Sequence, residues 1–563
     1  MKLLHAMFKS IFIVLSILLV TACGDGKGDE KGSKPPVVDK DAPVITINGS
    51  NTVTLLVGDQ YEELGATAKD NAGKDLEVKT SGSVDTTKAG KYVVTYSATD
   101  AAGKSSSAQR QVTVEEVRAF ITTWDTRGNG FSADNQIMID TIGDGYNYTV
   151  KWGDGKSDTN VTSDKMHTYD NPGIYQVEIT GHFPRFYLAE VTEQAGTVSQ
   201  KVEFHSDNHK LLTVKQWGNV KWASMSSMFT DAVNLKIEAT DTPNISAVTD
   251  FSKMLSGTAD IEYDITGWDV SNITNMSEMF AYSQFNQDIS SWKVNKVVSM
   301  QGMFAGATKF NQNIGDWDVS NVADMSYMFS GATSFNQDIG SWNVAKVTNM
   351  KGMFGSNADY NYLQNIGFGA VGVTYFPRPG ASKFNQNLNT WNVSNVTDMS
   401  NMFAGATSFN QNITSWNVAK VTNMQGMFAE ATLFNQDLST WSVANVTDMS
   451  FMFMKTAFNR DLSQWNVGNV VYMTRMFSEA GSFNQDVGDW DVTKVTEMAF
   501  MFDKVTLTSS NYNSLLTGWS RQQVKQNVVF HAGNSKYSGG ARFARNALID
   551  DFKWTITDGG SVN

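Results

Sequence analysis

Apolar residues recur along much of the chain at a nearly constant interval. From Trp268 to Trp490 a tryptophan returns every 24 or 25 residues, apart from one interval of 49, and a Met-Phe pair follows each of these tryptophans. A fixed period in this range indicates stacked repeats that bury their apolar faces against their neighbours. We therefore expect these residues to form a repeat core and not a metal or haem site. The nine tryptophans are Trp268, Trp292, Trp317, Trp342, Trp391, Trp416, Trp441, Trp465 and Trp490.

Two apolar spacings follow one another inside each repeat. From Ile339 to Val344 the pattern Ile-x-x-Trp-x-Val matches the strand spacing of a leucine-rich repeat. From Val347 to Phe354 the apolar positions fall at i, i+3, i+6 and i+7, which places four side chains on one helical face. The sequence therefore predicts an α/β solenoid of the leucine-rich-repeat type, with one strand and one short helix in each 24–25-residue rung.

Polar residues also recur in register between the apolar ones. The Asn-Gln of each Phe-Asn-Gln phrase is expected to form hydrogen bonds along the stack, as identical amide side chains do when strands stack in parallel. The positions just before and just after each tryptophan contain no aromatic residue and only one lysine. Interfaces usually depend on aromatic or arginine anchors, so this predicted face favours weak, polar contacts.

The repeated phrases resemble those of one known family. FNQDISSWKV, FNQNIGDWDV and FNQDLSTWSV, each followed by a segment like VTDMSYMF, resemble the BspA-like leucine-rich-repeat surface proteins of bacteria. The resemblance covers roughly residues 206–502, within a repeat domain that we place at residues 201–502. It implies a surface protein that binds other molecules through its repeats.

The interval of 49 residues contains a departure from the pattern. Residues 357–383 can be aligned with a repeat, but Pro377 and Pro379 forbid its helix. Either this decayed rung forms a recognition loop, or it is an eroded repeat whose aromatic residues fill the space of the missing tryptophan. Aromatic and arginine residues anchor many interfaces, so the candidate binding residues are Tyr362, Phe368, Tyr375, Phe376 and Arg378.

Two β-rich segments precede the repeats, and a differently patterned segment follows them. Short β-rich runs separated by turn residues predict a sandwich over residues 42–116, which resembles bacterial immunoglobulin-like surface domains. Residues 117–200 contain WGDGKSD and YDNPGIY and resemble the PKD sandwich, with the Gly-Asp-Gly phrase at a tight turn and not in a phosphate loop. Residues 503–563 are charged and are expected to cap the open end of the repeat core.

The N-terminus has the features of a bacterial lipoprotein signal. Lys2 and Lys9 flank the start of an apolar run too short to span a bilayer as a helix, and Val-Thr-Ala-Cys resembles the lipobox. We expect residues 1–22 to be removed, Cys23 to be lipidated and residues 23–41 to form a flexible tether. Because Gly24 follows the cysteine, the bacterial sorting rule implies the outer membrane, with the protein exposed at the cell surface.

Charge and residue content narrow the function. The formal net charge is −13, so the chain lacks the basic surface that a nucleic-acid partner requires. Cys23 is the only cysteine, and no Gly-x-Ser-x-Gly phrase is present. The pairs Asp316/Asp318 and Asp489/Asp491 lie on the predicted flat face, where no pocket would shift their pKa values. We predict no enzyme activity and no cofactor, with calcium binding by the sandwiches left open.

These inferences favour a monomeric, lipid-anchored surface protein that binds a protein or extracellular-matrix ligand and meets the membrane only through its lipid. The alternative is an envelope protein that binds polysaccharide or assists its degradation. The lack of aromatic residues on the predicted repeat face weighs against that alternative.

Overall fold

The computed structural model describes residues 41–188, 192–194, 201–203, 205–259, 262–356 and 379–562. The chain divides into two compact units, Met1–Glu116 and Val117–Asn563. Over the described ranges, no helix combines the length and the apolar character needed to cross a membrane. The predicted signal peptide, Cys23 and nearly all of the predicted tether lie outside the described residues.

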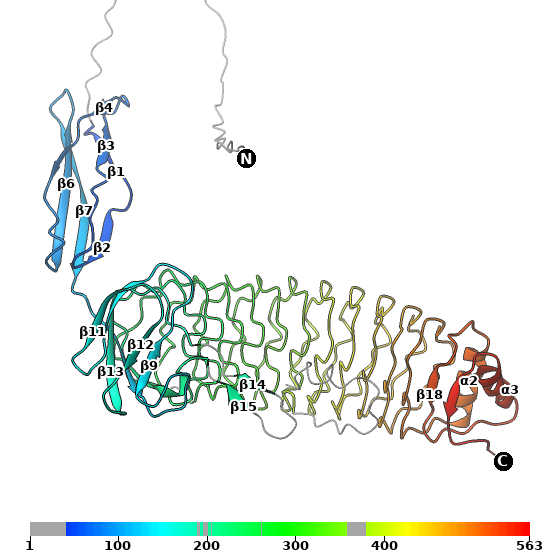
Figure 1. Cartoon of the computed structure of the whole chain (residues 1–563). Coiled ribbons are helices and arrows are strands. Elements are labelled where there is room, and N and C mark those ends of the chain that lie inside the picture. The colour runs from blue at the N-terminus through cyan, green and yellow to red at the C-terminus, as the bar shows by residue number, and fades with distance from the viewer. Residues whose placement is uncertain are drawn as a thin grey trace, which may run out of the picture. The chain divides into compact units, whose positions relative to one another are not determined.

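The first unit contains two β-sheets (Figure 1). β6 and β7 pair in antiparallel fashion along their length, and Tyr96, Val112 and Val114 on these strands are fully buried or nearly so. The alternation of buried and exposed residues on these strands is that of a sheet with one face on the core. One sheet has the order β1 (Val44–Ile47), β3 (Ala66–Lys69) and β4 (Asp75–Leu76); the other has the order β2 (Thr52–Leu56), β7 (Ser105–Glu115), β6 (Gly90–Thr99) and β5 (Lys79–Ser81).

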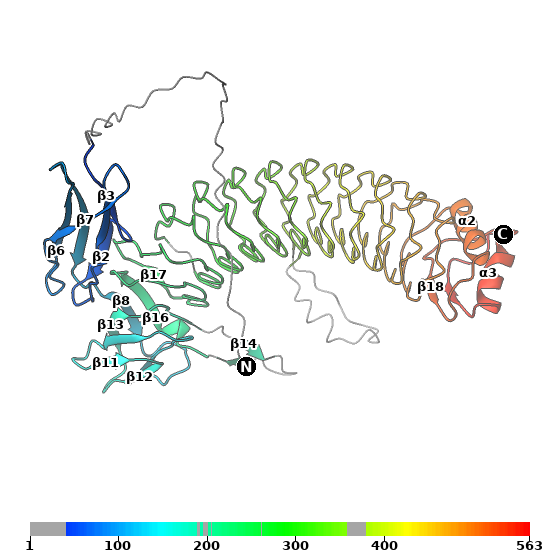
Figure 2. The same ribbon diagram turned by 90° about the horizontal axis from the view of Figure 1, so that it is seen from above.

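The second unit begins with a six-stranded sheet that continues into the repeats. β16 lies between β8, with which it pairs in antiparallel fashion, and β17, with which it pairs in parallel (Figure 2). The sheet has the order β11 (Ser157–Val161), β10 (Asn147–Lys151), β13 (Ile174–His182), β8 (Phe120–Asp125), β16 (Leu211–Gln216) and β17 (Lys236–Ile237). Two further pairs are β9 (Gln136–Ile139) with β12 (Lys165–Thr168), and β14 (Thr192–Gln194) with β15 (Lys201–Glu203).

The Gly-Asp-Gly phrase forms the turn between β10 and β11. Gly153 and Gly155 have φ angles of 82° and 88°, which glycine adopts without a steric penalty. The N–H of Trp152 donates to the carbonyl of Lys156 across the turn at 3.1 Å. The prediction of a turn in place of a phosphate loop is confirmed.

The prediction of an α/β leucine-rich-repeat solenoid is wrong. The described residues contain only two α-helices, α2 (Ser509–Ser520) and α3 (Ala541–Asp550), and both follow the repeats. The described residues 221–259, 262–356 and 379–502 form stacked coils made of turns and contain no strand or helix apart from β17 (Figure 1). Successive coils are joined by isolated parallel bridges, which run from Asp250–Asn275 to Tyr472–Glu497.

A left-handed residue explains why the predicted helices do not form. The residue before the second methionine of each Met-x-x-Met-Phe phrase has a φ angle of 54–63°, as at Glu278, Asn401 and Arg475. An α-helix requires negative φ at every residue. The next backbone N–H groups donate sideways to the following repeat, as Phe280 donates to Met303 at 2.9 Å. The apolar side chains still reach the core, but the hydrogen bonds link neighbouring repeats.

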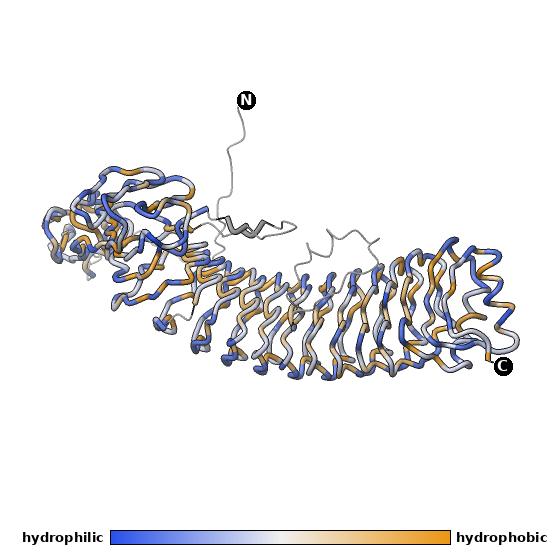
Figure 3. The backbone as a smooth tube through the Cα atoms, turned by 60° about the horizontal axis from the view of Figure 1, so that its bottom comes forward, coloured by the Kyte–Doolittle hydropathy of each residue, from blue (hydrophilic) through white to orange (hydrophobic). Residues whose placement is uncertain are grey.

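Identical aromatic side chains stack along the core. The phenylalanines of the Met-Phe pairs, from Phe280 to Phe502, have ring centroids 5.4–5.8 Å apart and interplanar angles of at most 11°. Successive coils in Figure 3 show the matching recurrence of hydrophobic and hydrophilic positions. Aromatic pairs contribute about 0.5–1.5 kcal/mol each beyond the burial of their area, so the stack is favoured when neighbours are alike.

The predicted amide ladder is confirmed. The Oδ1 atom of Asn410 accepts from the N–H of Asn435 and from Nε2 of Gln436, both at 2.9 Å. The bond from the backbone N–H links Asn286 to Asn311 and continues repeat by repeat to Asn484. At Asn435 the glutamine is replaced by Arg460, which donates to the backbone carbonyl of Asn435. Each buried or half-buried backbone group at this edge thus finds its partner in the next repeat.

The segment after residue 502 covers the last repeat. β18 (Val529–His531) pairs in parallel with β19 (Thr555–Thr557), and both helices pack beside this pair (Figure 2). Trp519 on α2 is fully buried, and its Nε1 donates to the carbonyl of Val487 at 3.1 Å. Asn511 on the same helix donates to Asn484 and so ends the amide ladder.

Candidate functional site

Most of the residues predicted to bind a ligand lie outside the described residues. This holds for Cys23 and for the five aromatic and arginine residues of the decayed rung, which are Tyr362, Phe368, Tyr375, Phe376 and Arg378. Their roles remain predictions. The described part of that segment, residues 379–383, rejoins the stack through Gly380 and Ala381.

The two repeats that flank residues 357–378 stack directly on each other. The rings of Trp342 and Trp391 are 6.4 Å apart, the same distance as those of Trp391 and Trp416. The N–H of Ala381 donates to the carbonyl of Phe354 at 2.9 Å, as in an uninterrupted repeat. The repeats of Trp342 and Trp391 are therefore direct neighbours in the described stack.

The nine repeat tryptophans are buried and serve the stack. Their side chains are 1–6% exposed. From Trp292 to Trp490, each Nε1 donates to the carbonyl of an Ile or Leu in the preceding repeat at 2.9–3.3 Å. None of these indole groups is placed to meet a ligand.

Two columns of left-handed residues lie where the coils turn. The first column is the residue before each Met-Phe pair, and the second is the residue four positions later. Left-handed backbone costs a residue other than glycine about 1–2 kcal/mol. The first column contains Ser227, Lys253, Glu278, Gly302, Tyr327, Gly352, Asn401, Gly426, Phe451, Arg475 and Phe500, and the second contains Asp231, Gly257, Tyr282, Gly306, Gly331, Gly405, Glu430, Lys455, Glu479 and Lys504.

Lysines in these columns face a carboxylate in a neighbouring repeat. Lys455 lies 2.7 Å from Glu430, and Lys504 lies 3.3 Å from Glu479. Lys253 likewise lies 3.7 Å from Glu278. The neighbouring repeats therefore balance charge along both columns.

An aromatic and arginine cluster departs from this pattern near the C-terminal end of the stack. We name Phe451, Tyr472, Arg475, Phe500 and His531 the aromatic–arginine patch. Arg475 Cζ lies 4.6 Å from the centroid of the Phe500 ring. The ring of His531 stacks on the same Phe500 ring, with the two centroids 5.7 Å apart. Tyr472 and Phe500 are 46% and 41% exposed.

The apolar spacing did not predict this patch, because it placed Phe451, Tyr472, Arg475 and Phe500 on helices beside the core. The sequence signal that could have revealed the patch is the residue type in the first left-handed column. Glycine or asparagine occupies the same place at Gly302, Gly352, Asn401 and Gly426, whereas Phe500 stands there at a φ of 57°. A bulky residue with positive φ is a steric outlier, and such outliers gather at functional sites.

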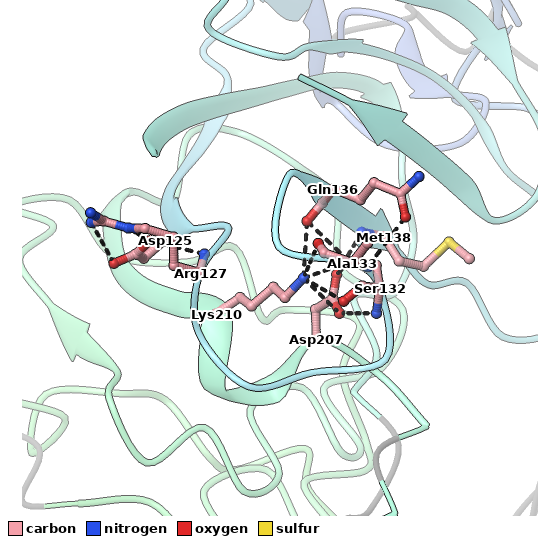
Figure 4. A network of polar contacts seen from close by, with 8 residues as sticks. All are labelled: Asp125, Arg127, Ser132, Ala133, Gln136, Met138, Asp207 and Lys210. Atoms are coloured by element: carbon pink, nitrogen blue, oxygen red, sulfur yellow. Dashed lines mark hydrogen bonds and ion pairs between the residues drawn. The ribbon is translucent and has the colours of Figure 1, made fainter. Parts of the chain in front are cut away.

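A buried ion pair lies at the other end of the repeats (Figure 4). The side chains of Lys210 and Asp207 are fully buried, with Nζ and Oδ1 3.8 Å apart. Lys210 Nζ donates to the carbonyls of Ala133 and Gln136 at 2.8 and 3.1 Å. Asp207 accepts from the N–H of Met138 at 2.8 Å. Burial lowers the pKa of Lys210. The hydrogen bonds of Lys210 hold the loop before β9 against the 3₁₀ helix η1 (Asn208–Lys210).

Asp140 beside this network titrates near neutrality. Burial is the main cause that raises its pKa to about 7, with Asp164 and Asp207 adding repulsion. The side chain of Ser206 forms a hydrogen bond with Asp140, which lowers its pKa in part and so opposes the effect of burial. In the described ranges, no group of three or more His, Cys, Asp or Glu residues is arranged to hold a metal ion.

Two open surface hollows lie along the repeats. One, of about 530 Å³, lies between the repeats of Trp342 and Trp391 and is lined by Asp338, Ser341 and Asn392 among others. Another includes Glu262, Asp288 and Lys309. Neither contains a residue of the aromatic–arginine patch.

The repeats match a known protein family. The family described as "Mycoplasma protein of unknown function, DUF285" matches residues 196–294, 223–315, 250–367, 378–457 and 439–539. Together these matches span more than half of the chain. The chain belongs to the DUF285 family. Its DUF285 repeats follow a match to the "Bacterial surface protein, Ig-like domain" over residues 45–114, which confirms the predicted immunoglobulin-like module. This DUF285 chain is therefore a bacterial surface repeat protein.

Two solved structures are similar over part of the DUF285 chain. The lipoprotein BT2262 from Bacteroides thetaiotaomicron is 19% identical with a TM-score of 0.13, over 25% of this chain and 62% of that one. The M60 catalytic domain with the CBM51-1 and CBM51-2 domains of Clostridium perfringens ZmpB is 16% identical with a TM-score of 0.12, over 24% and 21%. The chain thus spans less than two thirds of either structure. These low TM-scores carry no argument about function. A search of curated proteins found no match.

Proposed function

We propose that this surface protein is a non-enzymatic binding protein that presents its DUF285 repeats to a protein or extracellular-matrix ligand. It acts as a monomer and belongs with the BspA-like surface proteins. The observation that carries this proposal is the contrast between core and surface. The core columns repeat the same residues, whereas the left-handed columns change residue type from one repeat to the next. Such a constant scaffold with a variable surface suits recognition.

The proposal includes a lipid anchor on Cys23 and exposure at the outer membrane. Intact cells would be treated with protease, and the full-length protein followed by immunoblot beside a periplasmic control. We expect the protein to be lost while the control survives, and acyl labelling to disappear in Cys23→Ser. Full protection of the protein would contradict surface exposure and therefore an adhesive role.

The segment between the repeats of Trp342 and Trp391 offers a clean test of recognition. Deletion of residues 356–379 joins Gly355 to Gly380 and restores the spacing of an uninterrupted repeat, as in Phe403-Ala404-Gly405-Ala406. The flanking repeats already stack directly, so we expect the fold to persist. Cell attachment to immobilised matrix proteins should then fall at least about fivefold. Attachment equal to that of the wild type would remove this segment from the binding surface.

A further inference from the structure

The charge of Arg475 is unmatched at a place where other cations are paired. Lys455 and Lys504 in the second left-handed column each face a glutamate of the preceding repeat. For Arg475, the interaction found among the described residues is with the ring of Phe500. A guanidinium held over an aromatic face keeps its edge open, and that edge matches the two oxygens of a carboxylate.

The neighbours of Arg475 supply the other parts of a contact surface. Tyr472 stands three residues earlier in the same repeat and is 46% exposed. Phe451 occupies the equivalent left-handed position in the preceding repeat and packs against Ala429 and Met454. The Nδ1 atom of His531 accepts from the N–H of Gly533 at 3.2 Å, which leaves Nε2 to carry the proton. The patch thus combines ring surface with two donor groups, the guanidinium of Arg475 and the imidazole of His531.

Backbone strain adds an independent argument. Phe451, Arg475 and Phe500 have φ angles of 63°, 54° and 57°. Glycine fills this column in other repeats without strain, so the fold itself does not require a bulky residue there. Phe500 also remains 41% exposed and gains little from burial. Strained, exposed residues of this kind persist where they contribute to a function other than stability.

We propose that the aromatic–arginine patch binds a protein partner that presents an aspartate or glutamate side chain to Arg475. Charge complementarity selects the carboxylate, because Arg475 is the cation of these columns without a paired glutamate. A protein partner is favoured because aromatic and arginine residues with a polar rim are typical of the centre of protein interfaces. The inference rests on the proposed binding function and names the surface that performs it.

Binding of the full-length protein to immobilised poly-L-glutamate tests the proposal, with polygalacturonate as a carboxylate-bearing glycan and poly-L-lysine as a cationic control. We expect poly-L-glutamate to bind about tenfold more tightly than polygalacturonate. Arg475→Gln should weaken that binding about tenfold, and Arg475→Lys should weaken it severalfold because the planar fork is lost. Glu497→Gln should strengthen it, since an exposed carboxylate in the bridge column next to Tyr472 is removed.

Phe500→Gly separates binding from folding. Glycine accepts the φ of 57°, so the thermal midpoint should hold or rise while binding falls. Asn401→Gly in the same column is the matched control and should leave binding unchanged. Equal binding by the wild type and Arg475→Gln would overturn the proposal, and so would stronger binding to polygalacturonate, which would indicate an acidic glycan. Protease protection on cells would instead contradict the proposed function and leave this measurement in solution unaffected.

Discussion

The interior repeats and the base of the stack bury aromatic side chains in different ways. In the interior, like rings lie parallel, as Phe403 and Phe428 do at 5.7 Å and 2°. At the base, unlike rings meet edge to face, as Phe120 and Trp222 do at 5.1 Å and 87°. The base also buries a charged pair, Lys210 and Asp207. A repeat can thus be stabilised by a copy of itself, whereas the end of the stack needs residues that occur once.

Removal of the buried cation should give the largest effect. Lys210→Met leaves Asp207 buried without its partner and removes several donors to backbone carbonyls. We expect a loss of about 3–5 kcal/mol in the free energy of unfolding, measured by urea denaturation with tryptophan fluorescence. Lys420→Met is the control, because this exposed lysine bonds only to Asn395 of the neighbouring repeat and should cost less than about 0.5 kcal/mol. Equal effects would erase the contrast between base and interior.

The pH dependence of the base should sharpen the comparison. The pKa of Asp140 is about 7 in the folded protein, while an unfolded aspartate titrates near about 4. The folded state therefore holds the proton more tightly, and stability falls as pH rises from about 4 to 7. Asp140→Asn should remove this dependence and be more stable than the wild type at pH 8 by about 2 kcal/mol, with allowance for partial exposure. The urea midpoints of the wild type and of Asp140→Asn at about pH 4 and pH 8 check this prediction. An equal change of midpoint with pH in the two proteins would contradict it.

The smallest effect is expected from one step of the amide ladder. Asn410→Ala removes the acceptor for Asn435 N–H and Gln436 Nε2. Gln436 Nε2 keeps its bond to the backbone carbonyl of residue 410, but leaving the N–H of Asn435 half-buried and unbonded should cost about 1–2 kcal/mol. Ser442→Ala, on the exposed face of the next repeat, should be nearly neutral. A ladder variant as stable as the serine variant would show that the stack depends on its aromatic core alone.

The sequence predicted the core better than the backbone. The period and the apolar spacing identified the residues that are buried, such as Trp416 and Phe403, because burial depends on which side chains recur. The same spacing wrongly predicted helices, since i, i+3, i+6 and i+7 also suits a turn with one left-handed residue. Gly302, Gly352 and Gly426 at that place were the overlooked sign of positive φ.

The candidate site was harder to predict for a related reason. On a helix, Phe500 beside Met501 and Phe502 would extend the apolar face toward the core, so nothing in the spacing marks it as exposed. Its contacts with Arg475 and His531 also join three separate coils, and their register follows from the stacking and not from one repeat alone. The residues predicted within 357–383 remain untested.

The amide ladder also has a genetic consequence. Because each asparagine of the ladder accepts from the backbone N–H of the next one, interior repeats can follow one another in any order and keep that bond. Unequal recombination between such similar segments of the gene adds or removes whole repeats. Each product keeps the singular residues at both ends and the matched contacts between them. The number of repeats is therefore a trait that selection can lengthen or shorten without having to evolve a new core.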